Sequence, residues 1–497
     1  MMNVDLSTLL SWLDIDSDKL DINVTGLCLD SRKIKPEEVF IALSGHDNHG
    51  IDFAYQVQRS GACALLAESV NKGMAKPKSR QQPLTIPVIE IEHLSEKLGH
   101  LSSQFYGNPS SKLSVIGITG TNGKTSSAWL LLQAWKQLGI AGAYIGTLGY
   151  GTLEQMYELK NTTPSALEIQ TILARFVDQG MTHVAIEVSS HGLSLGRTNA
   201  VNFIGAGFTN ISRDHLDFHQ TMEDYAEAKK QLFLKDGLAF NVINLSDYYG
   251  KQWLAELKAK TSTYASDDNN ADLKATEIQL VPDGIHFKLT YNKNTHNIFT
   301  NLLGHFNIEN IMLVTAILLE TGHKLEDIIA IIPILEPVPG RVNRVQNKNN
   351  GPLVIVDYAH TPDALKQVLQ ALKQHNARKI WCVFGCGGNR DKGKRPQMGH
   401  IAETLADYVV ITDDNPRYED NQQITDDIIM GMNTKAKLIH DRKTAIEYVI
   451  NKAHNDDLIL IAGKGHETYQ LINGQYQTFD DRLCAAQLLA QASEKCA

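Results

Sequence analysis

The C-terminal part of the chain alternates short apolar runs with polar turns and helical segments. Its apolar runs read as buried strands, each ending in a polar or glycine-rich turn: PLVIVDYAH, KIWCVFGCGG, ADYVVITDDNPR and DDLILIAGKGHE. Strands that alternate with helices predict a parallel, doubly wound sheet. Ligands bind beyond the carboxyl ends of such strands. All four polar clusters fall at that edge, so we expect a substrate site there.

Two further units precede this one. The first hundred or so residues alternate short apolar runs with polar turns, as in VTGLCLDSRKIKPEEVFIALSG. A strand-like run, Ser114 to Thr119, then meets a glycine loop and a helical pattern, and PVPGRVNRV marks the start of the last unit. We predict an α/β protein with domains at residues 1–98, 99–337 and 338–497. The central domain is expected to be a P-loop-type parallel-sheet ATPase domain, and the C-terminal domain a Rossmann-like doubly wound one.

Composition narrows the class of protein. Hydrophobic residues make up 43% and charged residues 21% of 497 residues, which is typical of a folded globular chain. A net charge of −9 argues against a general nucleic-acid or membrane-surface binder. No apolar run reaches the roughly 18–20 residues that span a bilayer, and the acidic start lacks the basic region of a signal peptide. We expect a cytoplasmic protein, a monomer, without nucleic-acid or membrane partners.

The cysteines do not indicate a disulfide framework. Six are scattered along the chain, too few for a framework in a chain of this length. Cys382 and Cys386 are close in sequence, but no second Cys or His pair lies near them to complete a zinc site. We favour buried packing over metal binding for this pair.

The loop between the predicted strand and helix is a candidate phosphate site. It turns backbone N–H groups toward phosphate at a helix N-terminus, Lys124 can reach the β- and γ-phosphates, and Thr125 can supply a hydroxyl to Mg²⁺. Ile118 stands where the general P-loop has its first glycine, so this is the shorter G-x-x-G-K-T form. The alternative is a solvated glycine turn. The expected nucleotide-binding residues are Gly120, Thr121, Asn122, Gly123, Lys124, Thr125 and Ser126.

Two segments downstream carry candidate metal ligands. Glu187 lies on an apolar, strand-like run, HVAIEVSSHGL, and buried carboxylates need a partner, so a Mg²⁺ role is plausible. In FTNISRDHLDFHQTMEDYAEAKKQLF, His215 is a second candidate ligand. The neighbouring Asp214, Asp217 and His219 can equally form a cap and a solvated turn. Lys229 and Lys230, taken by themselves, read as the solvated face of a helix.

Together these segments resemble the Mur ligase family, which builds the peptide stem of peptidoglycan. The resemblance runs over nearly the whole chain, from LCLDSR to GKGHETYQ. It rests on TGTNGKTS, NTTP, EVSSHGL, FTNISRDHLDFH, GHFNIEN, PGRV, VDYAHTPDAL, GCGGNRDKGKRP, DDNPR and AGKGHE. It implies an ATP-dependent, Mg²⁺-requiring amide ligase with three domains. From the N-terminus, the first binds the uridine nucleotide, the second ATP and the third the incoming amino acid.

The resemblance also implies roles for residues that their pattern leaves open. Lys124, Glu187, His215 and Lys229 match catalytic positions, with Thr125, Glu187 and His215 as the Mg²⁺ ligands and Lys229 as a carbamylated lysine. Asn310, Arg341 and Asp357 match positions associated with ATP binding and domain closure. The implied contacts of the UDP-linked substrate are Leu29, Ser31, His46, Asp47, Asn48, Asn161, Thr162, Thr163, Ser189 and Arg197. Leu195 departs from the family pattern, where we expect Gln.

Arg417 indicates which amino acid is added. Asp414-Asn415-Pro416-Arg417 resembles the signature of family members that add meso-diaminopimelate. That substrate ends in a carboxylate-bearing group, which a guanidinium binds bidentately, whereas lysine ends in an ammonium that Arg417 would repel. An exposed turn arginine is the alternative. The other implied contacts are Arg390, Gly463 and Glu467, the last suited to an ammonium.

The expected reaction has two steps. The D-glutamyl γ-carboxylate of a UDP-linked muramoyl dipeptide attacks ATP to form an acyl phosphate, and the amine of diaminopimelate then displaces phosphate. Lys124, Mg²⁺ and the loop N–H groups offset the repulsion between the two anions. Rival functions are a lysine-adding or folylpolyglutamate-type ligase, and a P-loop switch or motor ATPase that forms no bond.

Overall fold

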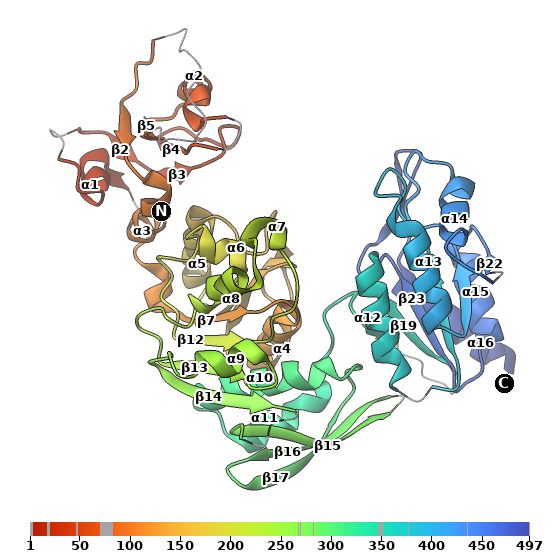
Figure 1. The fold of residues 1–497 in the computed structure, drawn as a ribbon. Helices are drawn as coiled ribbons and strands as arrows, with labels where there is room; N and C mark the ends of the chain where they lie inside the picture. The colour runs from red at the N-terminus through yellow and green to blue at the C-terminus, as the bar shows by residue number, and fades with distance from the viewer. Residues whose placement is uncertain are drawn as a thin grey trace. The chain divides into compact units, whose positions relative to one another are not determined.

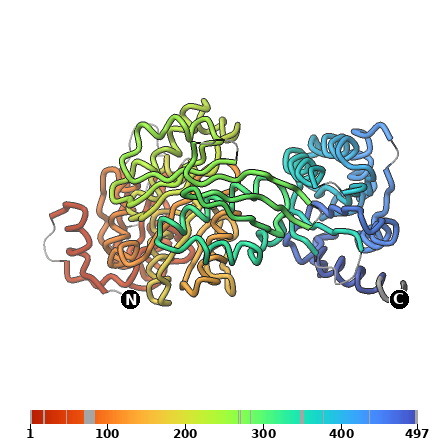
Figure 2. Tube along the Cα trace, turned by 90° about the horizontal axis from the view of Figure 1, so that it is seen from below, coloured from red at the N-terminus to blue at the C-terminus, as the bar shows by residue number. Residues whose placement is uncertain are grey.

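The computed structural model describes the chain except for residues 1–2, 17–19, 46–47, 70–82, 267, 269, 282, 346–350, 376, 435 and 497. The chain divides into two compact units, Met1–Ser262 and Thr263–Ala497. Each unit is described by itself below (Figure 1). Figure 2 follows the same chain as a Cα trace, with unit 1 running from red to green and unit 2 from green to blue.

Unit 1 begins with a four-stranded parallel sheet in the order β3-β4-β5-β6. Successive residues of β4 face opposite sides: Val39 and Ile41 join one hydrophobic cluster, and Phe40 and Ala42 the other. Both faces are therefore covered, as a parallel sheet requires. The elements here are β1 (Val4–Asp5), α1 (Leu6–Ser11), β2 (Asn23–Val24), β3 (Gly26–Cys28), β4 (Glu38–Ala42), η1 (Gly50–Phe53), α2 (Ala54–Arg59), β5 (Ala64–Glu68), β6 (Val88–Ile91) and α3 (Leu94–Phe105).

The rest of unit 1 is a larger sheet flanked by helices. Its strands follow the order β10-β9-β8-β11-β7-β12-β13, and β8, β11, β7, β12 and β13 are mutually parallel. The edge strands β9 and β10 are antiparallel, which the sequence pattern did not predict. The strands are β7 (Ser114–Thr119), β8 (Gly142–Gly146), β9 (Gly149–Gly151), β10 (Met156–Tyr157), β11 (His183–Glu187), β12 (Gly205–Phe208) and β13 (Phe240–Asn244). The helices are η2 (Pro109–Lys112), α4 (Lys124–Gln137), α5 (Ala166–Asp178), α6 (Ser190–Ser194), α7 (Leu216–His219), α8 (Met222–Lys230) and α9 (Tyr248–Trp253).

Unit 2 opens with an antiparallel meander. Strands β15, β16 and β17 pair in sequence, and β15 also pairs in parallel with β14, whose first residues belong to unit 1. The buried helix α10 follows the meander. The elements are β14 (Lys260–Ala265), β15 (Leu273–Val281), β16 (Gly284–Tyr291), β17 (Asn294–Thr300), α10 (Phe306–Glu320), α11 (Leu325–Ile331) and η3 (Ile332–Ile334).

The C-terminal part of unit 2 is the predicted doubly wound sheet. Its order is β18-β19-β23-β20-β21-β22, with β19, β23, β20, β21 and β22 parallel and β18 an antiparallel edge. The four predicted strands are β19 (Leu353–Asp357), β20 (Ile380–Phe384), β21 (Tyr408–Ile411) and β23 (Leu458–Ala462). The remaining elements are β18 (Asn343–Val345), α12 (Pro362–Lys373), α13 (Lys394–Leu405), α14 (Asn421–Ile429), β22 (Lys437–Leu438), α15 (Arg442–Lys452), β24 (Tyr469–Ile472), β25 (Gln475–Thr478) and α16 (Asp481–Cys496).

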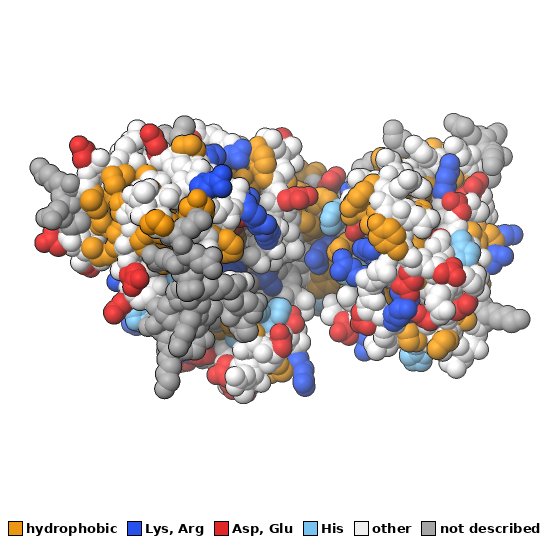
Figure 3. Space-filling view, turned by 90° about the horizontal axis from the view of Figure 1, so that it is seen from above, with side chains coloured by type: hydrophobic (Ala, Val, Ile, Leu, Met, Phe, Trp, Pro, Cys, Tyr) orange, Lys and Arg blue, Asp and Glu red, His pale blue; other side chains and the backbone are white. Residues whose placement is uncertain are grey.

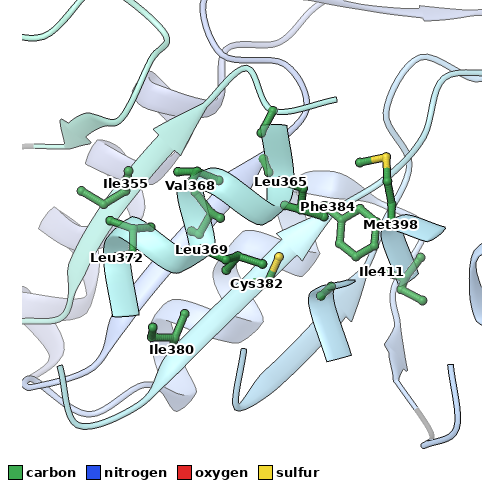
Figure 4. Close-up of a cluster of buried hydrophobic side chains, with 14 of the residues drawn as sticks. Ile355, Leu365, Val368, Leu369, Leu372, Ile380, Cys382, Phe384, Met398 and Ile411 are labelled. Atoms are coloured by element: carbon green, nitrogen blue, oxygen red, sulfur yellow. The ribbon is translucent and has the colours of Figure 1, made fainter. Parts of the chain in front are cut away.

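Helix α12 shows why this sheet forms. Thr361 caps its first turn by accepting the N–H of Ala364, and Pro362 starts the helix. Its apolar face packs on β20 at Cys382 and Phe384 (Figure 4). Each fully buried aliphatic side chain contributes about 1.5–3 kcal/mol. The apolar residues of this face are Leu365, Val368, Leu369 and Leu372.

The predicted α/β class is therefore confirmed, with parallel sheets in both units. The predicted domain boundaries stay predictions, and the one at residue 98 falls inside α3. None of the helices in the described part of the chain is both long and apolar enough to cross a membrane. Acidic and basic side chains are interspersed on the face shown in Figure 3.

Candidate active site

The phosphate loop lies where predicted, between β7 and α4. Gly120 has a φ of 150°, and a Cβ there would overlap the side chain of Thr209, so this position requires glycine. Gly123 precedes the first turn of α4 in the left-handed conformation. Lys124 folds back over the loop and donates to the carbonyls of Gly120 (2.9 Å) and Thr121 (2.8 Å). The loop thus combines backbone amides, a helix N-terminus and one lysine, which is a fit for phosphate.

Glu187 ends β11 beside this loop and is completely buried. Its Oε2 accepts from the Thr125 hydroxyl (2.8 Å), and its Oε1 accepts from the Thr147 backbone N–H (2.9 Å) and from the Tyr144 hydroxyl. A Cβ at Gly146 would overlap both this carboxylate and the Tyr144 oxygen. A buried carboxylate beside a phosphate loop and a threonine hydroxyl is a donor set that suits Mg²⁺.

The geometry gives His215 weaker support as a metal ligand than it gives Glu187. His215 is exposed, has a left-handed φ of 53°, and lies 3.5 Å from Asp214. Its ring packs edge-on against His191, with the centroids 4.8 Å apart. Within the described residues, no group of three or more His, Cys, Asp or Glu side chains could hold a metal ion by itself. Its assignment as a metal ligand stays a prediction, as does that of Glu187.

The reading of Lys229 and Lys230 as a solvated helix face is wrong. Lys229 is 1% exposed, donates to the Gly120 carbonyl (2.7 Å) and lies 4.5 Å from the ring centre of Tyr225. Burial, and then the charge of Lys124, hold the pKa of Lys229 well below its usual range. Lys230 is also buried and pairs with two glutamates. Helix α8 therefore turns both lysines inward.

Several residues that are predicted to bind the UDP-linked substrate lie together near the backbone of Glu187. Thr163 is buried, and its hydroxyl donates to the Glu187 carbonyl (2.8 Å) and accepts the Ser189 N–H (2.9 Å). Arg197 donates to the Thr163 carbonyl (2.8 Å). Thr162 lies within 3.1 Å of the Thr147 hydroxyl. The sheet edge thus brings these four predicted residues together, whereas Asn161 and Leu195 are exposed.

The predicted uridine site coincides in part with a pocket. A cavity of about 590 Å³ is lined by Leu29 and Ser31, together with apolar side chains of β4 and η1. Asn48 is exposed beside this strand, and its carbonyl accepts the Gly45 N–H (3.0 Å). His46 and Asp47 lie outside the described residues. The pocket has the polar and apolar lining that a nucleoside needs.

In unit 2 the turn Asp414-Asn415-Pro416-Arg417, called the signature turn below, packs against the β24–β25 hairpin. Arg417 has a left-handed φ of 57°, and its backbone N–H donates to the Leu471 carbonyl (2.8 Å). Its Nη1 donates to the carbonyl of Gly388 (3.0 Å). A Cβ at Gly463 would overlap the buried Asp414 carboxylate. Asn415 donates to Glu467 (2.9 Å). The structure thus gathers most of the predicted amino-acid contacts, with Pro416 buried inside the turn and Arg390 exposed beside it.

Three predicted nucleotide residues also lie in unit 2. Asn310 is buried on α10 and donates to Asn307 (2.9 Å). Asp357 ends β19 and accepts backbone N–H groups on both oxygens, at 2.7 Å each, although burial raises its pKa. Arg341 is exposed near it. Their roles stay predictions.

The predicted buried packing of Cys382 and Cys386 is confirmed. Cys382 and Cys386 are free and buried in the hydrophobic cluster of the C-terminal sheet. Burial raises the pKa of each thiol to about 12. Neither is a reactive thiolate at neutral pH.

The sequence reasoning missed four residues that position predicted side chains: Tyr144, Thr147 and Tyr225 in unit 1, and Lys464 in unit 2. Tyr225 holds Lys229 with its ring and Thr121 with its hydroxyl (3.1 Å). A signal existed for Lys464, since a lysine between two glycines at the end of a buried strand has little room to reach solvent. Tyr144 lies in an apolar strand and gave no such signal.

Comparison with known proteins agrees with this geometry. Family models match residues 23–106 ("Mur ligase family, catalytic domain"), 118–318 ("Mur ligase middle domain") and 340–465 ("Mur ligase, glutamate ligase domain"). The chain is 42% identical over 487 residues to a Haemophilus influenzae protein named UDP-N-acetylmuramoyl-L-alanyl-D-glutamate--2,6-diaminopimelate ligase, covering 95% of this chain and 97% of that one.

Two further comparisons extend the match. A Xanthomonas campestris pv. campestris protein of the same name is 42% identical over 474 residues, covering 94% of each chain. A solved structure of an enzyme with that name has a TM-score of 0.76 at 34% identity and covers 99% of this chain and 100% of its own. With the phosphate loop, the buried glutamate and the signature turn in place, these matches along the whole length show that the chain belongs to the Mur ligase family.

Proposed function

We propose that this chain is the ATP-dependent ligase that joins meso-2,6-diaminopimelate to UDP-N-acetylmuramoyl-L-alanyl-D-glutamate in peptidoglycan synthesis. The observation that carries the proposal is the direct contact between the phosphate loop and the two buried side chains of the expected chemistry. Thr125 bonds to Glu187, and the Gly120 carbonyl bonds to Lys229. The matched relatives bear the same activity in their names.

The first step activates the carboxyl group. An oxygen of the D-glutamyl γ-carboxylate attacks the γ-phosphorus of ATP, the bond to the β-phosphate oxygen breaks, and ADP leaves. Both reactants are anions, so their approach needs positive charge and N–H donors. Lys124 and the loop amides between Gly120 and Thr125 provide these at the amino end of α4. Mg²⁺, held by Thr125, Glu187 and His215, would neutralise phosphate charge.

The second step forms the amide. The neutral amine of diaminopimelate attacks the acyl carbon, the tetrahedral intermediate expels phosphate, and the nitrogen loses its proton. The chain's own residues contribute by holding the UDP-linked substrate and the amino acid. Thr163, Ser189 and Arg197 are bonded into one network. That network is suited to orienting the peptide end of the UDP-linked substrate.

Lys229 is proposed to react with CO₂. Its amine nitrogen bonds to the carbon and loses a proton, which replaces a cation with an anionic carbamate. The lowered pKa supports this proposal, because only the neutral amine attacks CO₂ and burial raises its neutral fraction at pH 7. A carbamate beside the phosphate loop can help to hold Mg²⁺.

Arg417 supports diaminopimelate as the acceptor. Its bonds to the Gly388 and Asn415 carbonyls both come from Nη1, so the other nitrogens of the guanidinium can donate to a carboxylate. A bidentate arginine–carboxylate pair is strong and directional. Lysine lacks that carboxylate, and a site built for a polar partner rejects an analogue without it by up to ~10⁴–10⁵.

Product mass spectrometry tests the proposal. The purified protein is incubated with the UDP-dipeptide, ATP and Mg²⁺, together with either meso-diaminopimelate or lysine. We expect the UDP-tripeptide only with diaminopimelate. Product with lysine would assign the chain to the lysine-adding ligases, and ATP hydrolysis without any new amide would indicate a P-loop ATPase. We place the reaction in the cytoplasm, where ATP and UDP-linked precursors are made, and a monomer remains our expectation.

A further inference from the structure

Lys464 is a fully buried lysine at the carboxyl end of β23. Its ammonium donates to the Asn415 side-chain oxygen (3.3 Å), to Oε2 of Glu467 (3.1 Å) and to the backbone carbonyl of Tyr469. An ammonium has three N–H donors, and each has an acceptor here. Lysine is almost never fully buried unless it is paired. A Cβ at the neighbouring Gly463 would overlap the Asp414 carboxylate, so the backbone beside Lys464 lies close to the signature turn.

Asn415 closes a ring with this lysine. Its amide nitrogen donates to Oε2 of Glu467 (2.9 Å), and its amide oxygen accepts from both Lys464 and the Leu471 backbone N–H (2.9 Å). A flipped amide would place its NH₂ group against two other donors. The side chain therefore has a single orientation, and its oxygen is already occupied by two protein donors. This arrangement assigns Asn415 a supporting role beside any direct contact with substrate.

Glu467 is the member of the ring that faces outward. Its side chain is 19% exposed, whereas that of Lys464 is 0% exposed. Both of its bonds, from Asn415 and Lys464, end on Oε2. Among the described residues, Oε1 accepts no bond. A carboxylate held by one oxygen presents the other in a fixed direction, at the strand-end edge where Arg417 also lies.

We propose that Lys464 is a positioning residue for the amino-acid substrate. It holds Glu467 and Asn415 from behind, so that Oε1 of Glu467 receives the ammonium of the substrate while Arg417 receives the carboxylate. The inference rests on the proposed function. The two charged ends of one zwitterionic group would then be recognised by side chains on two different loops, which Lys464 and the β24–β25 hairpin join.

The test is Lys464→Met in the full-length protein. Methionine keeps the length and removes all three donors. We expect the KM for meso-diaminopimelate to rise about ten- to a hundredfold, as the loss of charged hydrogen bonds predicts. The KM values for ATP and the UDP-dipeptide should change less than about twofold. An unchanged KM for diaminopimelate overturns the inference, and an equal rise in all three KM values indicates a merely structural role.

A double-variant cycle separates positioning from stability. Glu467→Gln alone should raise the same KM, and adding Lys464→Met to it should have little further effect, because the lysine acts through Glu467. Independent, multiplicative effects would contradict the proposal. Val449→Ala, a core change on helix α15 in the hydrophobic cluster that includes Ile459 and Ile461 of β23, controls for lowered stability and should leave all KM values unchanged.

A second variant and an assay of the wild-type protein complete the test. If Lys464→Met does not fold, Lys464→Gln keeps two donors without the charge and should show a smaller rise in the same KM, while no rise overturns the inference. The wild-type protein is assayed first. Failure to make any amide with diaminopimelate refutes the proposed function, whereas normal product with an unaltered variant KM refutes only the role of Lys464.

Discussion

Two neighbouring lysines on α8 are both buried, and their partners give them opposite acid–base behaviour. Lys229 has a backbone carbonyl and an aromatic ring around it, so desolvation dominates and its pKa falls. Burial alone would also lower the pKa of Lys230, but Glu227 and Glu256 outweigh it and raise the pKa. At neutral pH only Lys229 is therefore suited to react with CO₂.

Replacement of Lys229 tests the carbamate. Lys229→Ala should lower kcat by at least about a hundredfold, because the carbamate that would help to hold Mg²⁺ beside the phosphates is lost. Millimolar formate or acetate should restore part of the rate by entering the cavity, and initial rates of ADP release measure both effects. Lys230→Met is the matched control: it should reduce stability and gain nothing from the acids. A fully active Lys229→Ala enzyme would end the carbamate hypothesis.

The phosphate-loop lysine gives a second prediction at this scale. Lys124→Ala should abolish ADP release, with a loss of about a hundredfold or more in kcat, because no other side chain of the loop carries positive charge. We expect the fold to persist, because the bonds that Lys124 donates to the Gly120 and Thr121 carbonyls are local to the loop. Coupled ATPase rates and the thermal midpoint measure the two quantities. Normal turnover would remove Lys124 from the phosphate site.

At the scale of elements, the strand-loop-helix unit was predictable because its signals are local. The glycines, Lys124 and the apolar helix follow one another directly in sequence, and each of the four predicted strands of the C-terminal sheet is one short apolar run. The burial of Lys229 was not predictable from α8, because its partner Gly120 lies 109 residues earlier in the chain. The Asn415–Lys464–Glu467 ring and the Tyr144–Glu187 contact likewise depend on which strands become neighbours. The family resemblance predicted the role of Lys229, whereas only the tertiary structure showed that its side chain is buried.

The end of β8 yields a prediction about close packing. Gly146→Ala places a methyl group where the Glu187 carboxylate and the Tyr144 oxygen already lie. We expect a cost of about 1–3 kcal/mol and a displaced Glu187, because overpacked sites must shift their neighbours. Mn²⁺ titration followed by electron paramagnetic resonance should show weaker metal binding. Gly139→Ala, where a Cβ meets nothing within 4 Å although φ is positive, is the control and should leave metal affinity unaltered.

At the scale of the whole molecule, charge pairs make stability depend on pH. Arg395 is buried on α13 and bonds to Glu419 and Asp427 at 2.8–2.9 Å. The guanidinium lowers the pKa of both carboxyls. The folded state therefore holds fewer protons than the unfolded state near pH 4, so this stability is present above the unfolded pKa of about 4 and is lost as pH falls below it.

Arg395→Met tests this linkage. The variant should lose about 2 kcal/mol at pH 7, as expected for charged hydrogen bonds. Its thermal midpoint should also fall less than that of the wild type between pH 6 and pH 3. Lys379→Met removes an exposed ion pair with Asp407 and should alter neither quantity noticeably. Parallel acid profiles for wild type and Arg395→Met would contradict the assignment.

Because the backbone at Arg417 is left-handed, two substitutions there can separate the effect of the side chain on substrate binding from the effect of the backbone on stability. A side chain with a Cβ costs roughly 1 kcal/mol at a φ of 57°, whereas glycine avoids that penalty. Arg417→Ala and Arg417→Gly should therefore lose the diaminopimelate carboxylate contact alike, with similar rises in KM. Calorimetry should nevertheless find the glycine variant more stable than the alanine variant. This turn would then be a place where selection has kept an energetically unfavourable φ because it holds the guanidinium within reach of the substrate.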